Sequence, residues 1–459
     1  MSVTQTNVEA RPAARAVAAE SLERRSRERG EPSWLTQQRL AAGRAAESLP
    51  LPTRSTEGWR RIDLGGLDLD ELLTHRANGQ AVAATSTLAE NLGGIAGSLR
   101  IENGVVVERS LDPALAQQGV ILSSLRQAIA ERPDLVEPHL GRLVTGEEST
   151  FVALASALWE DGLFLYVPRG VAVDRPILNR ITSASGAPSF FRSLIVLGQQ
   201  AEATVVEDYL SGEAAGEALA SGVVELVTGQ ASRLRYANLQ EWNDRTWHFN
   251  SLKSDIGRDS KIDWLFVAVG GRVHRAEVDA GLTGQGSETD LVGLIFGSGE
   301  QQFDHQVLQD HIGNDTRSNS NFKAALGDAA SSNFQGLIRV NKTSLRTDSN
   351  LENRNLLLSD HSKAESDPRL EILNSDVVRC AHGATVGPLD PEIIFYIESR
   401  GVPQDEARRL VVEAFFEEVL EKIPVEAIRN SVWRTVQRKL GREVGPDDVP
   451  TGADAWQAG

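Results

Sequence analysis

The segment Cys380-Ala381-His382 contains the two side chains best suited to bind a metal ion. If Val377–His382 is a β-strand, side chains alternate between its faces, so Cys380 and His382 share one face with Cα atoms roughly 6.5 Å apart. A thiolate and an imidazole are good ligands for soft or borderline metals. Two ligands do not close a site, so a second chain would have to complete it. Spacing alone favours the other interpretation, a buried, inert cysteine beside a hydrogen-bonded histidine, because free cysteines are commonly buried.

A second cluster of candidate ligands is Asp304-His305 and Asp310-His311, followed by Asp315. The even offset between the histidines places both on one face of a strand if no bulge intervenes. The residue types allow metal binding. The spacing favours a polar ladder on a solvated strand face.

An enzyme that acts on polysaccharides is an alternative, because many β-helix proteins have that activity. The 64 Asp and Glu residues are too numerous for spacing alone to select a catalytic carboxylate pair. Trp242, Trp247 and Trp264 could line a sugar-binding groove, and they are equally plausible as core residues or as residues at the edge of a β-helix.

Motifs for nucleotide and metal enzymes are absent from the sequence. It contains no G-x-x-x-x-G-K-[ST] phosphate loop, no strand-linked G-x-G-x-x-G, no H-E-x-x-H and no C-x-x-C. Gly284-Gln285-Gly286 lacks the third glycine and a following helix, and it is interpreted as a turn. We therefore expect neither ATP hydrolysis nor NAD binding by a familiar route.

Composition narrows the class of protein. The chain has 459 residues, 41% apolar and 24% charged, as in ordinary globular proteins. A net charge of −17 argues against nucleic acid or an anionic membrane as the main partner. The single cysteine excludes an intramolecular disulfide and any Cys-rich metal site built by this chain alone, and it fits a reducing compartment.

The chain carries no recognisable targeting or membrane segment. Its N-terminal stretch, up to Glu31, mixes Arg with Glu and lacks the apolar run of a secretory signal. The longest apolar runs, such as Trp264–Val269, are far shorter than the roughly 20 residues that cross a bilayer. We expect a soluble, cytoplasmic protein.

The elements that would position these residues fall into three regions. Residues 1–162 form a helical and mixed region, with helix favoured over Ala13–Ala46 and near Leu111–Arg132 and Phe151–Trp159. Residues 163–387 carry short β-type runs punctuated by Gly, Asn, Asp and Ser. The absence of intervening helices indicates a sandwich, a barrel or a parallel β-helix. Polar stretches over Gly313–Asn321 and Asn350–Asn355 favour the β-helix.

The last region, residues 388–459, is predicted to be helical. Asp390-Pro391 is a typical helix start, and Gly401 with Pro403 ends that helix. A second helix over Gln404–Lys422 and a third after Pro424 follow. The second has one apolar stripe, widened by Phe416 and Leu420; the stripe comprises Ala407, Leu410, Val411, Ala414, Phe415 and Val419. These helices would cover the β core, and part of their apolar surface could also dock a partner protein.

Several segments resemble the SufB/SufD family of iron–sulfur cluster assembly proteins, and SufD members most of all. The most specific is Asp376–Gly387, which contains Cys-Ala-His-Gly-Ala-Thr-Val-Gly. Asn355–Ser359 and Pro368–Ile372 precede it, and Glu57-Gly58-Trp59-Arg60 is similar to the family's N-terminal E-x-W-R element. The resemblance covers roughly Pro52 to Ile423. The segment from Met1 to Pro50 has no counterpart that we can place.

The resemblance implies a right-handed parallel β-helix flanked by an N-terminal helical region and a C-terminal helical domain. It implies a partner of the SufB kind bound through the β-helix, and a SufC-like ABC ATPase bound through residues after about 388. It places Cys380 and His382 at the subunit interface, as candidate ligands of a nascent iron–sulfur cluster, with His382 the better one. The lone cysteine favours SufD over SufB. Family complexes can bind reduced flavin, for which no residue here is assigned.

The expected function is thus a non-catalytic scaffold subunit for iron–sulfur cluster assembly. Two alternatives stay open: a β-helix enzyme that acts on a polysaccharide, and a homodimer of this chain as a plain structural scaffold.

Overall fold

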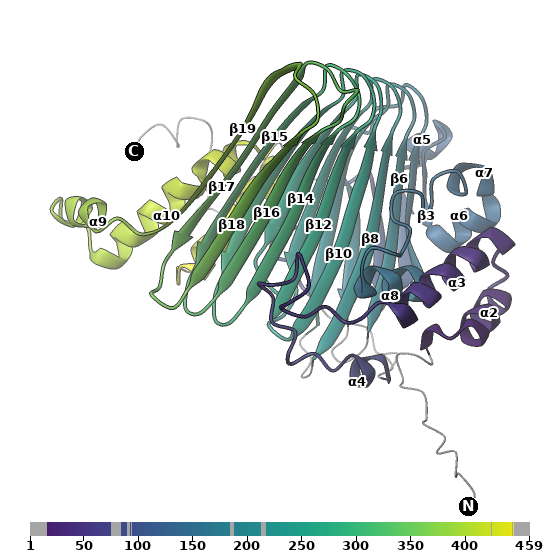
Figure 1. The fold of residues 1–459 in the computed structure, drawn as a ribbon, viewed down its shortest axis with the longest axis horizontal. Helices are drawn as coiled ribbons and strands as arrows, with labels where there is room; N and C mark the ends of the chain where they lie inside the picture. The colour runs from purple at the N-terminus through teal and green to yellow at the C-terminus, as the bar shows by residue number, and fades with distance from the viewer. Residues whose placement is uncertain are drawn as a thin grey trace, which may run out of the picture.

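A computed structural model describes residues 16–74, 84–89, 92, 94–183, 188–212, 217–423, 425–442 and 444. Its dominant feature is a parallel β-solenoid of about eight turns, flanked by N-terminal and C-terminal helices (Figure 1). From β4 onwards, successive strands alternate between a ten-stranded sheet, sheet A, and a nine-stranded sheet, sheet B. The predicted β-helix is confirmed, and the sandwich and barrel interpretations are wrong.

Sheet A runs in the order β19-β17-β15-β13-β11-β9-β7-β5-β1-β2, and sheet B in the order β18-β16-β14-β12-β10-β8-β6-β4-β3. The strands of sheet A are β1 (Gly97–Glu102), β2 (Val105–Leu111), β5 (Ile177–Ser183), β7 (Glu202–Ser211), β9 (Arg233–Glu241), β11 (Lys261–Ala268), β13 (Glu288–Gly297), β15 (Arg317–Leu326), β17 (Thr347–Leu357) and β19 (Val377–Pro388). Those of sheet B are β3 (Ile121–Ser124), β4 (Asp161–Val167), β6 (Ser189–Leu197), β8 (Ala218–Thr228), β10 (Thr246–Ile256), β12 (Val273–Leu282), β14 (Gln302–His311), β16 (Ser331–Val340) and β18 (Lys363–Ile372).

Equivalent positions of successive coils pair directly with each other. Lys261 pairs with Glu288 and Arg317 pairs with Asp348, and in each pair the second residue lies one coil further along the chain. Within each strand, alternate side chains point into the space between the sheets. The inward rows of neighbouring coils therefore stack and form one continuous core, which includes Phe322.

A left-handed residue recurs at one corner of each coil. Positive φ angles occur at Ala231, Asp259, Gly286 and Asp315, each close to one coil after the last. The amide of each donates a backbone hydrogen bond to the next coil, as from Ala231 to Arg258 at 2.8 Å and from Asp259 to Gln285 at 2.9 Å. The corner turns thus stack in register and fix the pitch of the solenoid.

The N-terminal helices cover one end of the solenoid (Figure 1). They are α2 (Ala19–Glu28), α3 (Ser33–Ser48), α4 (Leu69–Thr74), α5 (Pro113–Gln117), α6 (Leu125–Glu131), α7 (Pro133–Val136) and α8 (Thr150–Leu158). The predicted helix over Ala13–Ala46 is broken, because Gly30 turns the chain at a φ of +64° and Pro32 precedes α3. Its residues 13–15 lie outside the described ranges. The predicted helix over Leu111–Arg132 is also interrupted, by β3.

The three C-terminal helices occur where the sequence predicts them. They are α9 (Pro391–Glu398), α10 (Gln404–Glu421) and α11 (Glu426–Lys439). The Asp390 side chain caps α9 by accepting a hydrogen bond from the Glu392 amide at 2.8 Å. Helices α10 and α11 lie on the outer face of sheet A and share an apolar cluster with it. The covering role of these two helices is therefore confirmed.

The buried stripe of α10 differs from the predicted one. It consists of Ala407, Val412, Phe416, Val419 and Leu420. Leu410, which we expected to be buried, is 41% exposed. The helix is rotated so that its bulkiest residues face sheet A, where Phe416 lies 6.2 Å from Phe296 between ring centroids. Within the described residues, no helix is long and apolar enough to cross a membrane.

Candidate functional site

The Cys380–His382 segment lies in β19, the last strand of sheet A. Strand β19 pairs with β17, and the register sets Cys380 beside Ser349 and His382 beside Leu351. Ser349 and Leu351 are fully buried inward residues of the preceding coil. Cys380 and His382 therefore continue the inward rows of the solenoid and share one strand face, as the alternation predicts.

The two side chains differ in environment. Cys380 is partly buried and packs against the solenoid core, whereas His382 is exposed. Burial and the nearby Asp348 carboxylate raise the pKa of the Cys380 thiol above its ordinary value. A raised pKa disfavours the thiolate, which is the form of cysteine that binds metal ions.

The final coil leaves its inward face uncovered. In sheet B, Ile338 and Val340 are fully buried, while their counterparts one coil later, Leu370 and Ile372, are 38% and 40% exposed. In sheet A, Val386 on β19 is 45% exposed. The outer edges of β18 and β19 also have no further strand beside them in the described part of this chain. Cys380 and His382 thus sit on an open solenoid end that combines apolar side chains with two free sheet edges.

His305 and His311 share a strand face as predicted, but that face is the core. Both are 1% exposed or less, so the expectation of a solvated polar ladder is wrong. His311 hydrogen-bonds Thr316 at 2.7 Å and Ser318 at 2.9 Å. His305 packs against Phe322 at 5.7 Å between ring centroids. Burial lowers the pKa of each histidine to about 4, so both are neutral at physiological pH.

The aspartates of this second cluster are used structurally. Asp304 is buried and forms an ion pair with Arg275. Asp310 accepts a hydrogen bond from Asn341 at 2.8 Å, and Asp315 pairs with Arg346 at 2.5 Å. Within the residues that the structure describes, no group of three or more His, Cys, Asp or Glu side chains is arranged to hold a metal ion.

The tryptophans that could have lined a sugar groove are core residues. Trp242, Trp247 and Trp264 are 1–2% exposed. Trp242 and Trp264 lie between the sheets, and Trp247 lies in the apolar cluster under the N-terminal helices. The groove interpretation of these residues is wrong.

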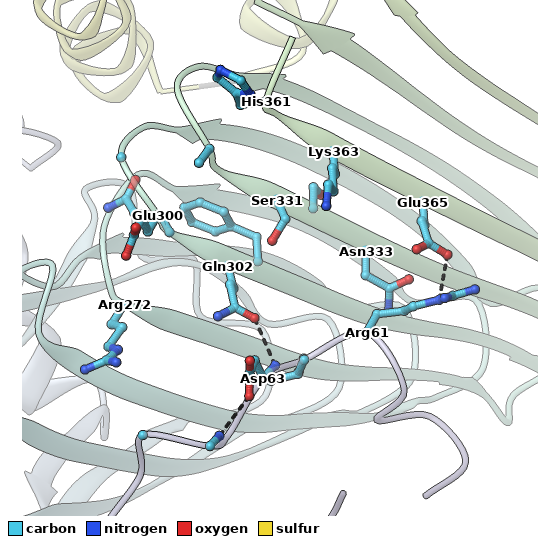
Figure 2. A pocket seen from close by; sticks show the side chains of 18 of the residues that line it. Arg61, Asp63, Arg272, Glu300, Gln302, Ser331, Asn333, His361, Lys363 and Glu365 are labelled. Carbon is cyan, nitrogen blue, oxygen red and sulfur yellow. Dashed lines mark hydrogen bonds and ion pairs between the residues drawn. The ribbon is translucent and has the colours of Figure 1, made fainter. Parts of the chain in front are cut away.

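A polar hollow of about 1050 Å³ lies where residues 54–66 cross the starts of β14, β16 and β18 (Figure 2). Many of its charged side chains are paired: Arg61 contacts Glu365 at 2.6 Å, and Arg54 contacts Asp63 at 3.0 Å. The Asp63 amide donates to Gln302 at 2.9 Å, which fixes the crossing segment to β14. The hollow has no exposed aromatic platform among its described lining residues, because its one aromatic residue, Phe303, is 2% exposed.

The E-x-W-R element anchors this crossing segment. Trp59 is buried, and the Arg275 guanidinium stacks on its ring at 3.9 Å. Arg275 also donates to the Gly58 carbonyl at 2.6 Å and pairs with Asp304. Sequence reasoning singled out Trp59 but not Arg275, because the contact joins segments that lie far apart in the chain.

Two polar groups inside the solenoid were not foreseen. The Glu207 carboxylate accepts hydrogen bonds from four neutral donors: Asn179 at 2.8 Å, and Ser193, Tyr209 and Tyr236 at 2.5 Å each. His248 and His274 from adjacent coils share an Nδ1–Nδ1 hydrogen bond of 2.8 Å. Only the pairing of distant strands brings these residues together, so no local sequence pattern marks them.

Helix α9 carries a second exposed apolar surface. Ile393, Phe395 and Tyr396 are 47%, 72% and 58% exposed. The helix contacts α10 and projects beyond the sheets (Figure 1). Large apolar side chains grouped on one projecting helix are typical of a protein-binding surface.

The molecule is thus a parallel β-solenoid with an open end that presents a cysteine and a histidine. Two family models match it: the SufBD protein N-terminal region over residues 22–178, and the SufBD core domain of the SUF system for FeS cluster assembly over residues 179–415. The chain belongs to the SufBD family of iron–sulfur cluster assembly proteins.

Curated relatives agree with this family. The iron–sulfur cluster assembly protein SufD of Bacillus subtilis is 27% identical over 89% of this chain and 95% of its own length. A SufBD family protein of Mycobacterium tuberculosis is 32% identical over 68% of this chain and 81% of its own. The B. subtilis iron–sulfur cluster assembly protein SufB is 24% identical over 90% of both chains.

Proposed function

We propose that this chain is a non-catalytic scaffold subunit of the SufD kind. It would pair with a SufB-like, cysteine-richer paralogue through the open end of the solenoid and dock a SufC-like ABC ATPase through its C-terminal helices. The complex would work in the cytoplasm. The single observation that carries the proposal is the uncovered last coil, which exposes inward residues together with Cys380 and His382.

An open solenoid end favours association with another solenoid. Free edges of β18 and β19 can extend their ladders into a partner's strands, and the exposed Leu370, Ile372 and Val386 can continue a shared core. A paralogue of the same fold would offer a matching edge. A second copy of this chain would offer one too, so an isolated chain could form a homodimer.

At such an interface, Cys380 and His382 would face the partner. The nascent iron–sulfur cluster is cargo here, shared between the two chains. His382 is exposed and supplies an imidazole nitrogen, while the partner would supply thiolates. Cys380 is the weaker candidate, because the raised pKa of its thiol disfavours the thiolate that binds iron. Reduced flavin could bind the complex, with no site assigned in this chain.

The ATPase would dock on α9 and the adjoining helices. Phe395 and Tyr396 form an apolar surface that α10 holds clear of the sheets. Because α10 and α11 are anchored on sheet A, force applied at α9 would pass to the strands that end in β19. ATP-driven movement of the partner could in this way open the interface and expose His382.

An anaerobic affinity purification of the tagged chain from its native lysate tests this proposal. We expect an ABC-type ATPase and a cysteine-richer paralogue to co-purify. Leu370→Glu should remove the paralogue and keep the ATPase, because it places a charge on the inward face of the open end. Glu371→Lys, on the outward face of the same strand, is the matched control and should keep both partners.

Recovery of the chain without either partner would contradict the scaffold proposal. Sedimentation of the purified chain, alone and then with the paralogue, separates a homodimer from a heterodimer. The polysaccharide alternative is weakened by the burial of its candidate tryptophans. A glycan-degradation assay that yields no product would exclude this alternative.

A further inference from the structure

A cavity of about 310 Å³ lies between the outer face of sheet A and the connection from α10 to α11. Ala237, Leu265 and Val292 form its floor and are neighbours across three successive strands. Ile423 and Ile428 form the facing wall. The cavity therefore joins the solenoid to the C-terminal helices, and its inner surface is apolar.

Charged side chains surround the mouth of this cavity. The Lys261 ammonium lies 2.9 Å from Asp263 and 2.6 Å from Asp290, so one cation is shared by two carboxylates. The Arg235 side chain is half-buried and, among the described residues, forms no hydrogen bond or ion pair. Lys422, the third cation of the lining, pairs with Glu418 at 3.2 Å, and Glu418 also pairs with Lys323.

Lys261 and Lys422 are thus paired with carboxylates, and Arg235 is the lining cation without a side-chain partner among the described residues, in a chain whose net charge is −17. A guanidinium presents paired donors that match a carboxylate, and its attraction for an anion strengthens beside apolar surface. The volume is near the lower end of ligand-binding cavities, which are commonly apolar with a few polar groups that fix orientation. Both the charge and the shape favour an anion with a short apolar tail.

We propose that this cavity binds a small amphipathic carboxylate, with its carboxylate on Arg235 and its tail on the floor of Ala237, Leu265 and Val292. Such a ligand would touch sheet A and the α10–α11 connection at once. It would therefore stabilise the docked position of the C-terminal helices by mass action. This inference does not depend on the proposed scaffold function.

Titration calorimetry of the full-length chain with octanoate tests the inference. We expect saturable binding with one site, weakened at least tenfold by Arg235→Gln. Arg233→Gln is the matched control, because Arg233 lies two positions earlier on the same face of β9, is exposed and does not line the cavity. Its affinity should equal that of the unmodified chain.

A second variant and a second probe test the contributions of the apolar tail and of the carboxylate to binding separately. Ala237→Phe should abolish binding by filling the floor, with folding checked by circular dichroism. Octanol should bind at least tenfold more weakly than octanoate, because it lacks the charge. The inference is overturned if octanoate shows no binding at millimolar concentration, if Arg235→Gln binds it normally, or if octanol binds equally well.

Discussion

Phe416 is one of the buried residues that attach the C-terminal helices to sheet A. It is fully buried between α10 and sheet A, 6.2 Å from Phe296 and 5.1 Å from Phe415 between ring centroids. Phe416→Ala removes this contact and leaves a cavity, which costs about 3–5 kcal/mol at a site of this kind. Because solenoid turns can unfold separately from attached elements, this cost should appear first as local opening of α10 and α11.

Hydrogen–deuterium exchange followed by mass spectrometry measures that opening directly. We expect amides in Gln404–Glu421 and Glu426–Lys439 to exchange at least a hundredfold faster in Phe416→Ala, since about 3 kcal/mol corresponds to a factor of roughly 150. Protection in β7, β9 and β11 should stay unchanged.

Phe395→Ala is the matched control, because Phe395 is 72% exposed and its loss should change stability by less than about 0.5 kcal/mol. If α9 docks the ATPase, this control should still lose that partner while keeping native exchange. Unchanged protection of α10 in Phe416→Ala would refute the account of how these helices are held.

Three further predictions concern the solenoid. Ala231→Gly should raise the free energy of unfolding by about 1 kcal/mol in urea denaturation, because Ala231 is exposed and has a φ of +57°. A loss of stability would contradict the inference that the left-handed corner is strained for alanine. His305 has a folded-state pKa of about 4 against 6.5 when unfolded, so the unfolded chain binds its proton first, and stability is lost as pH falls from 6.5 towards 4. His305→Phe should flatten that acid limb in thermal unfolding at stepped pH, and an unchanged slope would show that His305 does not contribute. Arg275→Ala should lower the free energy of unfolding by about 3–5 kcal/mol, because it leaves the Asp304 carboxylate buried and unpaired. Arg54→Ala, at an exposed ion pair, is the control and should lower it by less than about 0.5 kcal/mol. Equal effects in urea denaturation would contradict the argument from burial.

The sequence allowed the class of fold to be predicted, but not its repeat. Turn residues and short β-type runs indicated the β region, and Asp390-Pro391 and Gly401 located the start and end of α9. The coil length could not be recognised in the sequence, because it varies from one coil to the next. Each coil also contains two strands, and polar residues occur in the core. In β14, for example, His305, Gln309 and His311 point inward beside Phe303 and Val307, which blurs the apolar alternation.

The candidate site could be predicted only in part. The period of two along a strand was enough to place Cys380 and His382 on one face. Their position at an open end depends on β19 being the last strand of its sheet, which only the assembled fold reveals. The solvated face predicted for His305 and His311 was wrong for a similar reason. The alternation along a strand shows that two residues share a face, but it does not show which face of the sheet is buried. In α10, apolar residues occur nearly all round, and packing against Phe296 selects the Phe416 side.

The most direct test of the central claim is the iron and sulfide content of the anaerobically purified complex that carries His382→Ala. If His382 is an interface ligand of the nascent cluster, both partners should co-purify in normal amounts while cluster content falls at least tenfold. His361→Ala, an exposed histidine in the turn before β18, is the control and should retain full content. Normal cluster content in the His382→Ala complex would contradict the account.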